Sequence, residues 1–146
     1  MEKTKRILTA VALFGIFTVT GAAQIQEVKY ETAKMQHIVD KTIIPSLRSD
    51  IQGIVEGSIY NIILSKRYFS GLDFTNATEK LKRVVSEHSS PSIRYKAHLA
   101  LIYLSNADSI TITPISKAGS YDYLFRQISE EVSSKMLGNN GTIVQK

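Results

Sequence analysis

Two side chains able to bind an anion, Arg94 and His98, stand four residues apart in the segment SSPSIRYKAHLALIYLSN, residues 89–106. A helix places residues at this spacing on one face. Apolar residues flank the pair, so it forms a narrow polar strip that could hold a carboxylate, together with the matching Arg48 earlier in the chain. A structural role is the alternative that we favour, in which Arg94 bonds to carbonyls or carboxylates that close the neighbouring turn.

Other chemistry-bearing residues are sparse. His37 and Asp40 have the spacing of two metal ligands on a helix, but two ligands are too few and no HExxH-like pattern completes them. The absence of cysteine removes thiol catalysis and thiolate metal ligands. The chain also lacks the G-x-S-x-G, phosphate-loop and dinucleotide-binding motifs. We therefore assign no catalytic residue, no metal site and no cofactor.

Aromatic residues gather in two places. The last expected helix opens with Tyr121, Tyr123 and Phe125. A second group surrounds the expected link between two helical hairpins: Tyr60, Tyr68, Phe69 and Phe74. Half-exposed tyrosines on a helical surface suit binding of a protein partner, and we take Tyr121 and Tyr123 as candidates. Closure of the ends of a small core is the alternative role.

The first 23 residues predict a secretory signal peptide. Lys3, Lys5 and Arg6 form a basic start, an apolar run of 14 residues follows at 7–20, and Gly-Ala-Ala at 21–23 suits signal peptidase. The run is shorter than the about 20 residues of a membrane span. Without cysteine the chain cannot be a bacterial lipoprotein. We expect export to the periplasm or the exterior of a bacterium, with a retained N-terminal anchor as the alternative.

Cleavage after Ala23 would leave 123 residues, one domain that can bury a core without disulfides. The whole chain has a formal net charge of +5, but the signal holds three basic residues and one acidic residue. The mature chain would therefore carry 15 basic and 12 acidic residues, a net +3. This mild excess and the export signal lead us to expect no nucleic-acid partner.

The mature sequence predicts helices throughout, because its apolar residues follow the helical period. We expect a single all-α domain of two stacked helical hairpins and a C-terminal helix, followed by a flexible tail. The expected bounds are the domain at 24–138, hairpins at 26–67 and 75–107, the C-terminal helix at 120–137 and the tail at 139–146.

Proline, serine and glycine set the expected helix boundaries. The first helix should end near residue 41 and the second should begin at Pro45, since proline suits a first helical turn. Ser90 and Pro91 predict the cap and first residue of another helix, and Gly138 should end the last one. The glycines of a G-x-x-x-G step in the second helix, Gly53 and Gly57, are expected to let another helix approach closely.

The helix expected from Pro91 to about residue 107 is apolar on most of its circumference. Ile93, Ala97 and Leu101 lie on one side, and Leu99 lies on another. A helix that is apolar nearly all round is a buried one. We expect neighbours on two sides, with the C-terminal helix as the second cover and Lys96 as an isolated charge.

Two segments repeat. KMQHIVDKTIIPSLR (34–48) and KLKRVVSEHSSPSIR (80–94) align without a gap at an offset of 46 residues, with five of fifteen positions identical. Both end in Pro-Ser-apolar-Arg, and Ile51, Ile54 and Val55 continue the apolar stripe beyond the arginine. We interpret the match as a structural repeat with one buried stripe.

The segment SSPSIRYKAHLAL resembles the turn and second-helix start of a HEAT repeat, where a proline turn leads to an apolar residue, an arginine and a small residue. These residues are Pro91, Ile93, Arg94 and Ala97, with Pro45, Leu47 and Arg48 in the earlier unit. The offset lies within the period of such repeats, about 40–47 residues. The resemblance implies an α-solenoid-type stack of about two units.

These features predict a non-catalytic adaptor of the bacterial cell envelope that binds a protein partner through its helical surface. The candidate binding residues are Arg48, Arg94, His98, Tyr121 and Tyr123. One alternative is a small-ligand-binding protein or an enzyme whose site is assembled from scattered residues. Another is a membrane-tethered accessory subunit, if the signal is retained as an anchor. No pattern in the sequence sets an oligomeric state.

Overall fold

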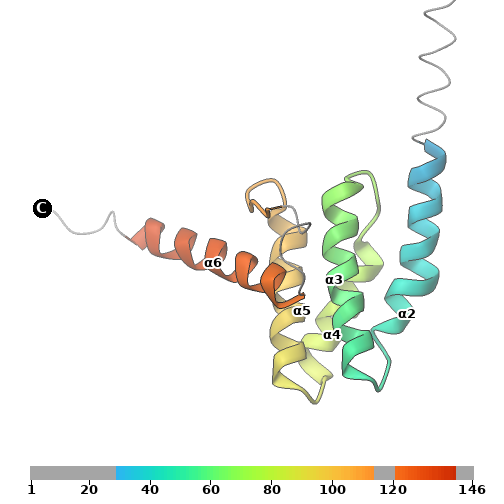
Figure 1. Cartoon of the computed structure of the whole chain (residues 1–146), viewed down its shortest axis with the longest axis horizontal. Helices are drawn as coiled ribbons and strands as arrows, with labels where there is room; N and C mark the ends of the chain where they lie inside the picture. Colours follow the sequence, from blue (N-terminus) through green and yellow to red (C-terminus); the bar gives the residue numbers. More distant parts are fainter. Residues whose placement is uncertain (1–28, 114–120, 141–146) are drawn as a thin grey trace, which may run out of the picture.

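The computed structural model describes residues 29–113 and 121–140, with side chains up to residue 136. All regular structure in this part of the chain is helical (Figure 1), which confirms the all-α class. The predicted signal at 1–23 lies outside the described residues, as does the tail from 141. The helical segments are residues 29–38, the π-helix η1 (Val39–Ile43), α2 (Ile44–Ser46), α3 (Gln52–Tyr68), α4 (Thr75–Glu87), α5 (Pro91–Asn106) and α6 (Tyr121–Asn140).

The first helix is longer than predicted, because the chain stays helical through η1 and α2. In the wide π turn, the backbone N–H of Ile44 donates to the carbonyl of Val39. A proline cannot donate a backbone hydrogen bond and crowds the carbonyl four residues before it, and a wide turn ahead of Pro45 relieves this crowding. The prediction that Pro45 begins the second helix is therefore wrong: α3 begins beyond the turn that follows.

The two helices of the second hairpin, α4 and α5, begin and end close to the predicted residues. The side-chain carboxylate of Asp73 accepts the backbone N–H of Thr75 at 2.8 Å, where α4 begins. Pro91 opens α5, and the Ser90 hydroxyl accepts the N–H of Ile93 as an N-cap. The helix ends at Asn106, and residues 110–113 have no regular secondary structure.

The sequence repeat does not produce equivalent turns. Pro91 follows its turn and opens a helix, whereas Pro45 precedes its turn and closes one. The apolar stripe is displaced as a result: Ile51 and Ile54 are 62 % and 44 % exposed, while Val55 is buried as expected. The matching residues of the two segments therefore do not all face the same side of their hairpins.

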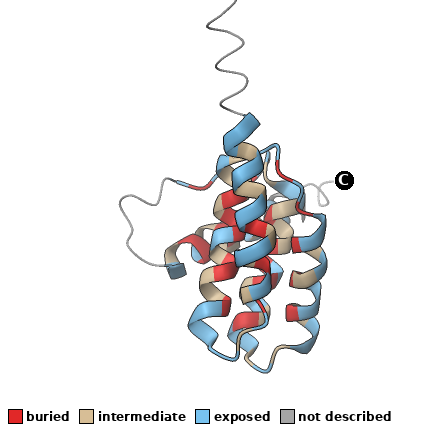
Figure 2. Ribbon diagram, turned by 90° about the vertical axis from the view of Figure 1, so that its right-hand side faces the viewer, coloured by how far each residue is buried: buried red, intermediate tan, exposed pale blue. Residues whose placement is uncertain are grey.

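Helix α5 lies at the centre of the bundle. It packs against α3, α4 and α6, as its apolar circumference predicted, and α2 contacts both α3 and α4. Figure 1 shows α3 and α5 side by side, so the second helix of one hairpin packs on the second helix of the other. The buried hydrophobic residues form one core cluster, and buried residues are red on the ribbon in Figure 2.

The first half of α6 covers α5 and α3, and the second half leaves the bundle (Figure 1). Leu124, Phe125 and Ile128 are buried, whereas Met136 is 64 % exposed. Burial of each of the three large side chains contributes about 1.5–3 kcal/mol, which is enough to hold the first two turns in place. The prediction that Gly138 ends this helix is wrong, because α6 continues to Asn140.

The two glycines of α3 do not serve a close helix approach. A Cβ at Gly53 would meet nothing within 4 Å, and a Cβ at Gly57 would lie 3.8 Å from the hydroxyl oxygen of Tyr121. That distance is an ordinary van der Waals contact, so neither site requires glycine for reasons of space. The expectation that these residues admit a neighbouring helix is therefore wrong.

We predict that Gly57→Ala stabilises the protein, because alanine is about 1 kcal/mol more favourable than glycine inside a helix and its methyl group fits here. Urea unfolding followed by circular dichroism measures the change. Gly53→Ala, at the exposed first turn of α3, serves as the control and should have a smaller effect. A loss of stability in Gly57→Ala would show that the α3–α6 contact needs glycine after all.

Candidate functional site: a charged cleft between the hairpin turns

The turns of the two hairpins lie at the same end of the bundle (Figure 1), and a cleft of about 850 Å³ opens between them. Leu47 and Val84 line it with their buried side chains and supply an apolar floor. The remaining lining residues are polar or charged: Arg48, Ser49, Asp50, Gln52, Lys80, Arg83, Glu87, His88 and Ser89. The cleft therefore combines a small apolar area with a charged rim.

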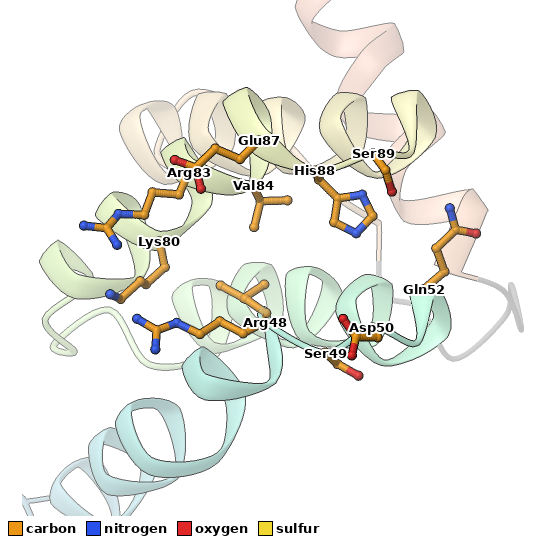
Figure 3. A pocket seen from close by; sticks show the side chains of 11 residues that line it. Arg48, Ser49, Asp50, Gln52, Lys80, Arg83, Val84, Glu87, His88 and Ser89 are labelled. Atoms are coloured by element: carbon orange, nitrogen blue, oxygen red, sulfur yellow. The ribbon is translucent and has the colours of Figure 1, made fainter.

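Three basic side chains gather at one end of the cleft (Figure 3). Arg48 comes from the first hairpin turn, and Lys80 and Arg83 come from α4. None of the three forms an ion pair with another described residue. Unneutralised like charges held near one another attract an anion, and a partly enclosed site strengthens the attraction.

The opposite end of the cleft offers both hydrogen-bond donors and acceptors. Asp50, Gln52 and His88 lie there in Figure 3. Because Asp50 and Glu87 also line the cleft, its three cations are set against two carboxylates. The lining therefore carries little net charge, with Asp50 at the end away from the three cations and Glu87 beside Arg83 in Figure 3.

Hydrogen bonds hold one wall of the cleft, the turn between α4 and α5. Nη1 of Arg94 donates to the carbonyl of His88 at 2.7 Å and to that of Ser89 at 3.2 Å. Nδ1 of His88 accepts the backbone N–H of Ser90 at 3.0 Å. The structural role expected for Arg94 is thus confirmed, and this residue positions the cleft wall from behind.

The other predicted binding residues lie apart from the cleft. His98 is exposed on α5 and does not line the cleft, so the proposed polar strip of Arg48, Arg94 and His98 is not a continuous site. Tyr121 packs on Tyr60 at the start of α6, with ring centroids 4.6 Å apart. Tyr123 lies beneath the guanidinium of Arg126, whose carbon is 5.3 Å from the ring centroid.

Sequence reasoning missed Lys80 and Arg83. Both follow the polar side of an amphipathic helix, which is typical of solvated residues, and the sequence of α4 alone does not distinguish them from Lys82. Their spacing of three residues places them on one face, which was the available signal. Stacking of the hairpins then brings that face beside Arg48.

Lys96 is not the isolated charge that the sequence predicted. Its ammonium group lies 2.5 Å from a carboxylate oxygen of Glu56 on α3 and 2.7 Å from one of Asp122 on α6. It also lies 5.3 Å from the ring centroid of Phe125. Burial lowers the pKa of Lys96, but the hydrogen bonds to Asp122 and Glu56 outweigh this effect, and the pKa lies above its ordinary value. The same contact lowers the pKa of Asp122.

We predict that Lys96→Met destabilises the protein by about 1–3 kcal/mol, because it leaves the half-buried Glu56 carboxylate without its cation. Lys82→Met is the matched control, since its pair with Glu79 is exposed to solvent and should contribute little to stability. Chemical unfolding near neutral pH measures both changes.

The difference in the free energy of unfolding between wild type and Lys96→Met should decrease as the pH falls through the lowered pKa of Asp122, where that carboxylate takes up a proton. It should also shrink as the pH rises through the raised pKa of Lys96. Equal effects of Lys96→Met and Lys82→Met would contradict a special role for the three-helix contact.

Metal chemistry finds no support in the described residues, where no three His, Asp or Glu side chains are placed to hold an ion. Asp40, paired with His37 in the sequence reasoning, instead accepts the Gln36 amide at 3.0 Å. Across the described part of the chain, no helix has both the length and the apolar character needed to cross a membrane.

No protein-family model matches the chain, and no curated protein or solved structure does so either.

Proposed function

We propose that the protein is an exported, non-catalytic adaptor that binds a protein partner through the surface of its two helical hairpins. The cleft between the hairpin turns is the observation that carries this proposal. It is open, it has an apolar floor, and its basic side chains form no ion pair with a described residue. Such a combination of apolar centre and polar rim is typical of protein interfaces.

The arrangement of the hairpins supports a HEAT-like stack. Helix α3 packs on α5, and α2 contacts α4, so each hairpin helix has its counterpart as a neighbour. Helix α6 contacts both hairpins, through α5 and α3, whereas a terminal cap of a repeat protein contacts only the last unit. The displaced turn after Pro45 departs from the HEAT pattern, and the stack has two units where about three are usual.

A small-ligand-binding protein is the second candidate function. The cleft volume of about 850 Å³ falls within the range of small-molecule sites, about 300–1,000 Å³. Its lining is predominantly polar, whereas such sites are mostly apolar, and this difference favours a protein partner.

Export makes a direct prediction about the chain terminus. When the full chain is expressed in a bacterium, signal peptidase should remove residues 1–23 and leave Gln24 as the first residue. Intact-mass spectrometry of periplasmic and membrane fractions measures the product. A membrane-bound chain that retains Met1 would instead support the tethered accessory subunit.

Site-specific photo-crosslinking in the producing cells tests the adaptor function. A photoreactive residue at Ser89 lies in the cleft wall and leaves every cleft charge intact, and the same residue at Lys82 lies outside the cleft. We expect Ser89 to yield a discrete protein adduct that Lys82 does not yield. If neither these positions nor Tyr121, Tyr123 and His98 yield a protein adduct, the adaptor function is wrong.

A further inference from the structure

We propose that the cleft binds an acidic linear segment of the protein partner, with the segment's carboxylates held by Arg48, Lys80 and Arg83. This inference rests on the proposed function, because it names the feature of the partner that the cleft recognises. It assigns one ligand to Arg48 of the first hairpin and to Lys80 and Arg83 of the second, which lie far apart in the sequence.

The basic end of the cleft suits carboxylates. A guanidinium group donates two parallel hydrogen bonds to one carboxylate, and the cleft offers two such groups, on Arg48 and Arg83. Lys80 adds a third, half-buried cation from α4. Since none of these cations is paired with a described carboxylate, a ligand need not displace an internal partner before it binds.

The rest of the lining favours a peptide over a phosphate group or an anionic membrane. Asp50 and Glu87 also face the cleft, and their charges would repel a polyanion or a dense layer of anionic headgroups. A segment in which acidic residues alternate with apolar ones avoids this repulsion. Its apolar side chains could cover Leu47 and Val84, and Asp50 could accept backbone N–H groups.

Both walls are ordered by hydrogen bonds within the protein. Arg94 holds the α4–α5 turn, as described above, and the hydroxyl of Ser49 accepts the backbone N–H of Ile51 at 3.1 Å in the other turn. A preformed cleft lowers the entropy lost on binding. Contacts to a few carboxylates can then contribute measurable affinity.

Fluorescence anisotropy with the protein expressed from the full chain tests the inference. The probe is a fluorescein-labelled peptide of alternating glutamate and leucine, and the control probe has glutamine in place of glutamate. We expect saturable binding of the acidic probe, weakened by added salt because the contacts are ionic. Arg48→Gln and Arg83→Gln should each raise Kd about tenfold, equivalent to about 1.4 kcal/mol.

Lys82→Gln is the matched control, because it removes a charge from the same helix outside the cleft and should leave Kd unchanged. Circular dichroism melts establish that each variant is folded. The charge-reversed double variant Arg48→Glu/Arg83→Glu should bind a basic probe of alternating lysine and leucine, and this result would support the assignment. Equal affinity for the glutamine probe would overturn it. Displacement of the labelled probe by inorganic pyrophosphate or phosphatidylglycerol vesicles at lower concentration than by the unlabelled acidic peptide would also overturn it. An equal loss of affinity in Lys82→Gln and Arg48→Gln would do the same.

The outcome separates this inference from the adaptor function. If crosslinking captures the same partner from wild type and from Arg48→Gln/Arg83→Gln, the adaptor function stands and the cleft assignment is wrong. If the acidic probe binds in the cleft but no surface position captures a protein in cells, the adaptor function is wrong instead.

Discussion

Helix α5 is apolar on most of its circumference, so it needs neighbouring helices on several sides. Its burial against α3, α4 and α6 draws the two hairpins together and recruits the last helix as a cover. Buried apolar residues of α6 stabilise that contact, and Lys96 links α5 to α3 and α6 through Glu56 and Asp122. The charge on α5 is tolerated because both neighbours provide carboxylates for it.

The cleft follows from the same packing. When the second helices of the hairpins stack, their turns come to the same end of the bundle and leave a space between them. Its basic side chains come from both hairpins, so the site exists only in the stacked structure. Arg94 links the core to the cleft, because it extends from the central helix α5 to the carbonyl groups of the cleft wall.

A helix start or a hydrogen bond was predictable where the residues that cause it and the backbone groups that they contact lie in the same short segment. Ser90 and Pro91 began α5 as expected, and Arg94 bonded to its own preceding turn. Prediction failed where backbone register mattered. The first helix continues through a π turn past Pro45, and Ile51 and Ile54 are exposed, although the two segments of the repeat share the same Pro-Ser-apolar-Arg ending.

The sequence by itself determined the all-α class, the burial of α5 on several sides and the absence of any thiol chemistry, since each depends on composition or on a period of a few residues. The tertiary structure alone decided the partners of Lys96 and the grouping of Arg48 with Lys80 and Arg83. These contacts join residues some 26 to 40 positions apart. Helix periodicity says which face a side chain occupies, but only packing determines which other helix meets that face.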